Sequence, residues 1–283
     1  MLKADLHIHT TASDGKLTPA KTVSLASERK LDVIAITDHD TISGVEEAKM
    51  ASKEYGITVI RGAEISTLFE GREAHLLAYG FEDSGIMQRL FSYQKNRRRQ
   101  RAKVIIANLN KLGFDITYDE VLGEAGSGTI GRPHIARVMI RKGFAVDTRD
   151  VFFRYLGNHS KAYHRIDYPD ISEAIDKVHQ AGGCAVLAHP ADNYNFIELR
   201  RLKDYGLDGI ECYHPSHSVD YQRRYMDYCH INDLIVTGGS DFHGKVQDFY
   251  HLGVVYVKLG TDSPLLNISE IPSSGVTGTY PHT

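Results

Sequence analysis

The sequence predicts an α/β fold built around a barrel-like, mostly parallel sheet. Short apolar runs of strand length alternate with helix-length amphipathic stretches along most of the chain. No GxGxxG or GxxxxGKS/T motif follows a strand-like run, which disfavours an open sheet with a glycine-rich nucleotide loop. Histidine and acidic side chains recur where the apolar runs end, and parallel barrels place their functional residues at these C-terminal strand ends.

The first part of the chain is expected to contain strands and helices in alternation. Thr18 is a favourable N-cap and Pro19 fits the first helical position, so a helix is expected to begin there. A second helix is expected across residues 43–55. Strands are expected at residues 4–9, 32–37, 58–65 and 74–79.

The pattern changes between residues 93 and 168, where β-type apolar runs nearly vanish. We predict a helical insertion here, with helices at 96–112, 118–124, 132–142 and 147–156. The alternation resumes with a helix at 171–181 and strands at 184–188, 209–212, 235–238 and 254–257. Residues 1–92 and 169–270 are expected to form the barrel, and residues 271–283, rich in Ser, Gly, Thr and Pro, a loosely held tail.

Composition narrows the class of protein. The 283 residues carry a formal net charge of −3, so the chain is not built to coat nucleic acid, and an anionic substrate needs a local positive site. The basic run 95–103 is expected to face solvent mostly, with one or two arginines at a substrate entrance. Three widely spaced cysteines suit small buried positions in a reducing compartment. No signal-like start and no apolar stretch near ~20 residues is present, so we expect a cytoplasmic protein without membrane contact.

The first candidate ligands are two histidines in the first strand. His7 and His9 are two residues apart, so both side chains project from one face of the strand and can hold a metal ion together. Asp14 follows in a loop of small residues that can bring its carboxylate back toward the strand end.

Further polar groups end the second and third strands. Asp38, His39 and Asp40 directly follow a β-branched apolar run, where core packing would cost much desolvation free energy. Glu64 lies among apolar neighbours, and a carboxylate there is expensive unless it is paired or bridges two cations.

The remaining candidates lie in later strands. His75 by itself is more typical of a hydrogen-bonded core histidine. His189 ends a strand and is followed by a proline, and Asp241 and His243 sit two apart in a glycine-containing segment whose glycines are expected to pass close to a ligand.

These motifs together resemble the polymerase and histidinol phosphatase (PHP) superfamily. The resemblance rests on segments 6–10 with 14–15, 37–40, 62–64, His75, 188–190 and 239–243, which occur in the expected order. It implies a distorted (β/α)7 barrel that carries three divalent metal ions at its C-terminal face. Mn²⁺, Fe²⁺ and Zn²⁺ all suit mixed imidazole and carboxylate ligands.

The resemblance also implies a role for each residue. It assigns His7, His9, Glu64 and Asp241 to one metal ion, with Glu64 bridging to a second ion held by His75 and His189, and Asp14, His39 and His243 to the third. Glu64 and Asp241 are thereby expected to be essential for turnover. Asp38 and Asp40 are expected to orient imidazoles without touching a metal ion. His214, His217, His230 and His251 match no motif and are interpreted as structural or surface residues, His214 least securely because it also follows a strand.

Within the superfamily, segment 129–136 of the insertion resembles small nucleotide phosphoesterases. This implies that Arg132 and His134 face the metal centre and hold the substrate phosphate, for which Arg offers a two-pronged donor. Solvent-exposed charges at a helix start are the alternative. The hypothesis is hydrolysis of nucleotides, or of the 5′ ends of short oligonucleotides, by a metal-activated hydroxide, with His134 or a water protonating the leaving group.

Three alternatives remain open at this point. Histidinol-phosphate phosphatase has the same fold and metals, but the insertion with Arg132 and His134 favours nucleotides. Phosphodiester hydrolysis by a small exonuclease can coexist with monoester hydrolysis at one centre. A non-enzymatic metal-binding or polymerase-accessory module should have lost ligands, and none is missing here. The expected partner is a small phosphorylated substrate, with no stable protein partner implied.

Overall fold

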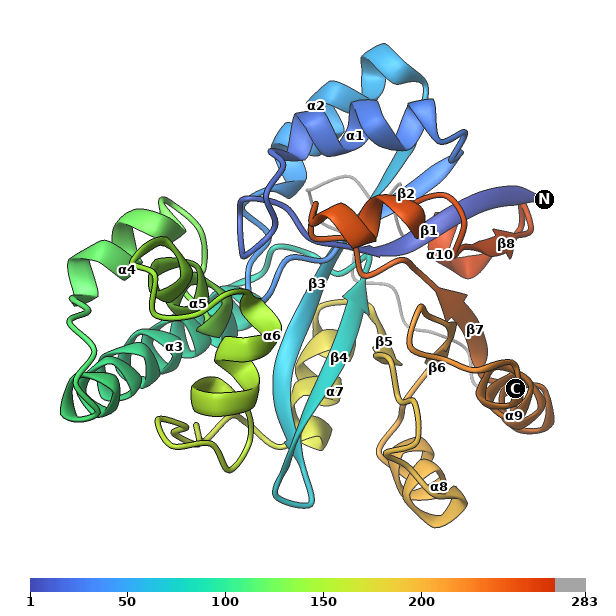
Figure 1. The fold of residues 1–283 in the computed structure, drawn as a ribbon. Coiled ribbons are helices and arrows are strands. Elements are labelled where there is room, and N and C mark those ends of the chain that lie inside the picture. The colour runs from blue at the N-terminus through green and yellow to red at the C-terminus, as the bar shows by residue number, and fades with distance from the viewer. Residues whose placement is uncertain (268–283) are drawn as a thin grey trace.

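The computed structural model describes residues 1–267 and arranges their strands in one sheet of order β7-β6-β5-β4-β3-β2-β1-β8. The predicted tail, residues 271–283, lies outside the described residues, as do residues 268–270 of the predicted barrel. Figure 1 shows the strands curling around a common centre with helices outside them. The fold is thus the distorted α/β barrel with a helical insertion that the sequence predicted.

The parallel strands follow the predicted positions closely. They are β1 (Leu2–Ile8), β2 (Val33–Ile36), β3 (Thr58–Phe69), β5 (Cys184–Leu187), β6 (Gly209–Tyr213) and β7 (Ile235–Gly238). Within this set, β1, β2 and β3 are parallel neighbours, and so are β5, β6 and β7.

Two strands run against the others. β4 (Arg72–Tyr79) is antiparallel to both β3 and β5, because a tight turn at Glu70 and Gly71 joins it to β3 as a hairpin. Gly71 has a φ of +77°, a conformation that glycine adopts at little cost. The strand expected at 254–257 lies at β8 (Val257–Leu259) and pairs antiparallel with the start of β1.

The barrel closes at β1. The first residues of β1 pair with β8, whereas its end contacts the segment after β7, where the amide of His9 donates to the Phe242 carbonyl at 2.8 Å. A Cβ on Gly239 would lie 2.4 Å from the His7 nitrogen, so this position admits only glycine. The close approach seen at this glycine is to the backbone of β1.

The outer helices of the barrel include two that the sequence analysis did not assign. The expected ones are α1 (Pro19–Glu28), α2 (Val45–Tyr55) and α7 (Ile171–Gln180); the others are α8 (Phe196–Asp204) and α9 (Val219–Asn232). Thr18 caps α1 by accepting from the Lys21 amide at 3.3 Å, as predicted. A 3₁₀ helix at Val246–Tyr250 and the short α10 (Pro264–Asn267) complete the described chain.

The insertion forms a helical layer at one side of the barrel (Figure 1, left, green). It consists of α3 (Gly85–Lys111), α4 (Tyr118–Ala125), α5 (Arg132–Arg141) and α6 (Thr148–Val151), followed by a π-helical turn at Phe152–Leu156. The first helix begins at Gly85 and not at Asn96 as expected, because Met87, Leu90 and Phe91 bury its first turns against the barrel. The rest of the insertion packs around an apolar cluster of its own, from Ala102 to Ala162.

The barrel interior is filled with side chains. Tyr79 from β4 is fully buried, and its hydroxyl donates to the Leu6 carbonyl of β1 at 2.9 Å, across the barrel. Within residues 1–267, every helix is too short or too polar to span a bilayer. The packed interior leaves the C-terminal ends of the parallel strands as the place for a site.

Candidate metal centre

The nine predicted metal ligands lie together at one end of the barrel. Their donor atoms form three groups within which all atoms lie within 4.8 Å of one another. The groups are His9, Asp14, His39 and His243; His7, His9 and Asp241; and Glu64, His75 and His189. Among the described residues these groups contain all nine predicted positions and no others. They agree with the proposed ligand sets except at two residues: His9 belongs to two groups instead of one, and Glu64, which was expected in two sets, belongs to one.

Glu64 lies at the centre of this arrangement. Its side chain is 1% exposed, and its two carboxylate oxygens contact five imidazoles. The distances are 2.7 Å to His75 Nδ1, 2.9 Å to His189 Nε2, 3.0 Å to His39 Nδ1, 3.2 Å to His9 Nε2 and 3.4 Å to His7 Nε2. A buried carboxylate surrounded by so many potential ligands has the geometry of a bridging group between cations.

Electrostatics keep this carboxylate ionised. Burial alone would raise the pKa of Glu64, but the neighbouring His75, His39 and His7 hold it well below its usual range. Conversely, burial would lower the pKa of His9, but Asp241 and Glu64 raise it to about 10. Each group is therefore stabilised in its charged form by an opposite neighbour a few ångströms away.

Two imidazole nitrogens in the centre lack a hydrogen-bond partner among the described residues. Nδ1 of His9 and Nδ1 of His39 are both buried and form no hydrogen bond, although each lies near a carboxylate, Asp14 at 3.9 Å and Glu64 at 3.0 Å respectively. A buried polar atom without a partner costs free energy, and such atoms mark places where a further group is bound. The donor set of imidazole and carboxylate suits transition-metal dications, so the residues present fit the metal ions that the sequence resemblance implies.

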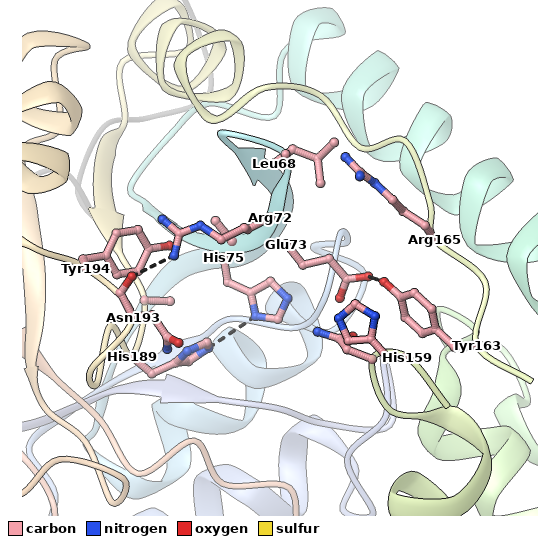
Figure 2. Close-up of a pocket in the computed structure, with 14 residues that line it drawn as sticks. Leu68, Arg72, Glu73, His75, His159, Tyr163, Arg165, His189, Asn193 and Tyr194 are labelled. Atoms are coloured by element: carbon pink, nitrogen blue, oxygen red, sulfur yellow. Dashed lines mark hydrogen bonds between the residues drawn. The ribbon is translucent and has the colours of Figure 1, made fainter. Parts of the chain in front are cut away.

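His75 enters the cluster because β4 is antiparallel. In a parallel strand, a residue so near the strand's beginning would lie at the far end of the barrel. The reversed direction of β4 places its first residues beside the ends of its neighbours, with His75 opposite Ser66 of β3. The side chain of His75 then reaches His189, 3.3 Å away, as Figure 2 shows.

Two residues of the cluster were missed by the sequence analysis. Glu211 is 1% exposed; one carboxylate oxygen accepts from His7 Nδ1 at 3.0 Å and the other from the His189 amide at 2.7 Å. His214 Nε2 is buried, has no hydrogen-bond partner in the described chain, and lies 3.5 Å from the Asp241 carboxylate. Glu211 lies among the apolar residues of β6, as Glu64 does in β3, and His214 directly follows β6, as His189 follows β5 at one residue's distance.

Asp38 and Asp40 hold loops in place and do not bond to imidazoles. Asp38 accepts from the amide and hydroxyl of Thr10, both at 2.7 Å, and from the Ser13 hydroxyl at 2.6 Å, which fixes the loop leading to Asp14. Asp40 accepts from the amide of Ser66 at 2.8 Å and from the guanidinium of Arg98. The expectation that these two carboxylates orient imidazoles directly is thus not what their hydrogen bonds show.

Arginines of the insertion border the cluster. A cavity of about 210 Å³ is lined by Asp14, His39, His75 and His243 on the barrel side and by Arg98, Arg101, Arg132 and Lys245 among others. Glu73 accepts from Arg101 at 2.8 Å and from Arg132 at 3.2 Å, so two guanidinium groups share one carboxylate. One or two arginines of the run 95–103 were expected at a substrate entrance. Arg98 and Arg101 line this cavity, whereas Arg97 pairs with exposed Asp167.

His134 is buried beside this cavity. Its Nδ1 accepts a hydrogen bond from the Gly131 amide at 3.0 Å, which caps helix α5 and leaves the ring proton on Nε2. Burial and the nearby Arg137 lower the pKa of His134 to about 4, so the ring is neutral near pH 7.

A larger cavity of about 620 Å³ adjoins the cluster on its other side. It is lined by the β3–β4 hairpin, residues 158–165 of the insertion and the loop after β5, with His75 and His189 at its base (Figure 2).

The chain matches a known protein family. The profile of the PHP domain family matches residues 5–183, more than half of the chain. The chain belongs to the PHP domain family. The match contains six of the nine clustered positions, from His7 to His75, and the structure supplies the other three.

Relatives of this PHP protein extend the similarity over most of its length. It is 38% identical to a 5′-3′ exoribonuclease of Haemophilus influenzae over 85% of this chain and 90% of the relative. It is 31% identical to a phosphoribosyl 1,2-cyclic phosphate 1,2-diphosphodiesterase of Eggerthella lenta, covering 88% and 97%. It is also 31% identical to a 3′,5′-nucleoside bisphosphate phosphatase of Chromobacterium violaceum, covering 86% and 88%.

Two solved structures have a similar fold. A Bifidobacterium adolescentis protein assigned as a metal-dependent phosphoesterase is 35% identical, with a TM-score of 0.81 over 86% of this chain and 89% of that chain. An amidohydrolase from Chromobacterium violaceum, crystallised with bound sulfate, is 28% identical with a TM-score of 0.82 over 93% and 92%. The protein is thus a metal-dependent phosphoesterase, a hydrolase of the PHP family.

Proposed function

We propose that this PHP protein hydrolyses phosphate esters of nucleotides, from nucleoside monophosphates and 3′,5′-bisphosphates to the 5′ ends of short oligonucleotides. The observation that carries the proposal is the position of Glu64, buried among five imidazoles and next to an arginine-lined cavity. Such a site can hold cations on one side and phosphate oxygens on the other.

The proposed cofactors are three divalent cations, Mn²⁺, Fe²⁺ or Zn²⁺. Glu64 would bridge one ion held by His7, His9 and Asp241 and a second held by His75 and His189, with Asp14, His39 and His243 around the third; the three donor groups support this division. When bound, such ions lower the pKa of a coordinated water and balance charge on the phosphoryl oxygens. Glu211 keeps the proton of His7 on Nδ1, so that its Nε2 is free to act as a ligand.

Arg132 is the proposed phosphate-binding residue. Its guanidinium is held by Glu73 and by the Leu156 carbonyl at 3.2 Å, which fixes it at the wall of the smaller cavity. Because Arg101 shares Glu73, the group keeps a net positive charge that attracts a phosphate. Lys245 lines the same cavity and adds to this charge.

We propose a narrower role for His134 than the one the sequence suggested. A general acid must carry a transferable proton at working pH, but the lowered pKa of His134 leaves it neutral. His134 is also 1% exposed and lies outside the lining of the smaller cavity, so it does not reach a phosphate held there. We therefore propose His134 as the cap of helix α5, which positions Arg132 at the helix start, and a water as the source of the leaving-group proton.

The reaction is a hydrolysis in which one water is consumed. Its oxygen bonds to phosphorus, the ester P–O bond breaks, and the leaving oxygen takes up a proton. Arg132 and the imidazole-bearing strands hold the phosphate in line for this exchange.

The relatives favour nucleotides over the alternatives. Their names describe hydrolysis of RNA, nucleoside bisphosphates and a cyclic sugar phosphate, which does not favour histidinol phosphate. The complete set of nine ligand positions argues against a non-enzymatic accessory module. The cysteines are free and buried, which supports a reducing, cytoplasmic location.

The proposal is tested by phosphate release from the Mn²⁺-loaded protein on four substrates. These are AMP, adenosine 3′,5′-bisphosphate, a 5′-phosphorylated trinucleotide and histidinol phosphate. Preference for the nucleotides is expected, and preference for histidinol phosphate would overturn the substrate class.

A matched pair of variants tests the site itself. Glu64→Gln should reduce phosphate release by at least about 10³-fold, because the lost charge removes the bridge between two cations. Glu54→Gln, which alters an exposed glutamate at the end of α2, should leave turnover unchanged. Equal activity of the two variants would show that Glu64 is not part of the site.

A further inference from the structure

The loop after β5 carries a metal-ligand position on strained backbone. His189 has a φ of +26° and Ala191 a φ of +43°, both in the left-handed region that residues other than glycine seldom adopt. Such conformations cost free energy and persist only where the surrounding contacts hold them. His189 belongs to the donor group of Glu64 and His75, and its Nε2 lies 2.9 Å from a Glu64 oxygen. The contacts that hold this loop therefore also place a ligand of the second proposed cation.

Three side chains bond to the backbone of this loop. Glu211 accepts from the His189 amide at 2.7 Å. The Ala191 amide donates to Nε2 of His217 at 3.0 Å, and the Ala191 carbonyl accepts from the Tyr225 hydroxyl at 2.7 Å. Both polar groups of the Ala191 backbone are thus held, one by α9 and the other by the residue that precedes the cap of α9.

The hydrogen bonds of His217 leave its ring one arrangement of protons. Its Nδ1 lies 2.8 Å from the Cys212 carbonyl, which can only accept, so Nδ1 carries the proton. Its Nε2 is then without a proton and is free to accept from the Ala191 amide. A cationic ring would turn one N–H toward another, so the neutral ring with its proton on Nδ1 is the form that fits.

His217 is itself held firmly in place. It is 7% exposed, and its ring centre lies 5.7 Å from that of Tyr225, which is fully buried. Its carbonyl accepts from Gln222 Nε2 at 3.3 Å, and the next residue, Ser218, caps α9. An acceptor fixed by a helix start and by a core aromatic ring can in turn fix a mobile backbone amide.

His217 lies beside the metal centre without belonging to it. Within residues 1–267, the three donor groups do not include it, and it lines neither of the two cavities at the cluster. Both of its ring nitrogens are bonded to backbone groups. Any effect of His217 on the centre must therefore pass through the backbone of the loop that carries His189.

We propose that His217 is a positioning residue: by accepting from the Ala191 amide, it holds the loop after β5 in the conformation that directs His189 at the second cation. The inference rests on the cofactors of the proposed function and goes beyond its ligand set. Nε2 is the nitrogen that acts on the loop, and the bond from Nδ1 to Cys212 serves to keep the proton away from Nε2.

Two variants separate the nitrogens of His217. Glutamine places its side-chain oxygen near the position of Nε2, so His217→Gln keeps the acceptor for Ala191 and loses the donor to Cys212. Asparagine is shorter and places its amide nitrogen near the position of Nδ1, so His217→Asn keeps the donor and loses the acceptor. His230→Gln, at an exposed position of the same helix, is the matched control and should bind metal like wild type.

Mn²⁺ binding to the full chain is measured by competition with a chromophoric chelator. One ion should bind about 10–100-fold more weakly in His217→Asn, as is usual when a group that orients a ligand is lost, and within about threefold of wild type in His217→Gln. Electron paramagnetic resonance is a second readout, because two Mn²⁺ ions bridged by a carboxylate are magnetically coupled. At limiting Mn²⁺, the coupled signal should be lost in His217→Asn and kept in His217→Gln. Equal affinities of the two variants, or weaker binding in His217→Gln, would overturn the proposal.

Tyr225→Phe provides a test that does not depend on the folding of the His217 variants. It keeps the ring and removes only the hydroxyl that holds the Ala191 carbonyl, so the affinity for one Mn²⁺ ion should fall about fivefold, the equivalent of one neutral hydrogen bond. Unchanged affinity would contradict the role of this loop. These readouts use no substrate. A wild type that binds Mn²⁺ but releases no phosphate from nucleotides would refute the proposed function alone, whereas equal binding by His217→Asn and His217→Gln would refute this inference whatever the turnover.

Discussion

Replacing Glu211 by glutamine tests whether this carboxylate sets the tautomer of a metal ligand. Both oxygens of Glu211 accept hydrogen bonds, one from His7 Nδ1 at 3.0 Å and the other from the His189 amide at 2.7 Å. Glutamine keeps the shape but has a single acceptor oxygen, so its NH₂ group must face one of the two donors. If it faces His7, either that bond is lost or the proton moves to Nε2, which points into the cluster.

The magnitude follows from the burial of the site. Glu211 is 1% exposed, so no bulk water replaces the lost bond, and a hydrogen bond to a charged group contributes about 1.5–3 kcal/mol. At roughly 2 °C per kcal/mol for a chain of this size, the melting temperature should fall by about 3–6 °C. Metal affinity should fall about 10–100-fold, as is usual when a group that orients a ligand is lost.

Competition with a chromophoric chelator measures metal affinity, and differential scanning calorimetry measures the melting temperature. The exposed Glu54→Gln variant is the reference for both measurements. If Glu211→Gln binds Mn²⁺ within twofold of this reference, Glu211 does not control the tautomer of His7.

Two further variants examine neighbouring groups. Glu73→Gln should lower the free energy of unfolding at pH 7 by about 2–4 kcal/mol, because Arg101 and Arg132 lose a shared, mostly buried carboxylate. Burial would raise the pKa of Glu73, but the two arginines lower it below 4.5 in the folded protein. The contribution of Glu73 to the free energy of unfolding is therefore present above pH 4.5 and is lost as the pH falls through the lowered pKa of the folded state. Urea unfolding at pH 7 and at pH 3 should therefore show the difference from wild type shrinking, and a constant difference would contradict the pairing. His214→Ala should reduce kcat at least about tenfold, because the imidazole of His214 lies 3.5 Å from Asp241. His230→Ala, at an exposed position of α9, is the control and should leave kcat unchanged. The same kcat for both variants would show that His214 has only a structural role.

Much of the fold and most of the site could be predicted from the sequence because the signals are local. The two-residue period of a strand places His7 and His9 on one face, and polar groups after buried β-branched runs, such as His39, need a functional reason. Helix starts were equally local: Thr18 before Pro19 predicted the cap of α1. Each of these inferences depends on residues within a few positions of one another.

What only the tertiary structure decided depends on groups distant in the chain. Glu211 lies 204 positions from His7, so no spacing rule could pair them. The direction of β4, which brings His75 into the cluster, depends on its hairpin with β3 and not on the composition of the strand. Among the arginines, the local sequence showed only charge. That Arg98 and Arg101 are paired follows from the carboxylates that the fold brings near them, since long-range Coulomb contacts are set by packing.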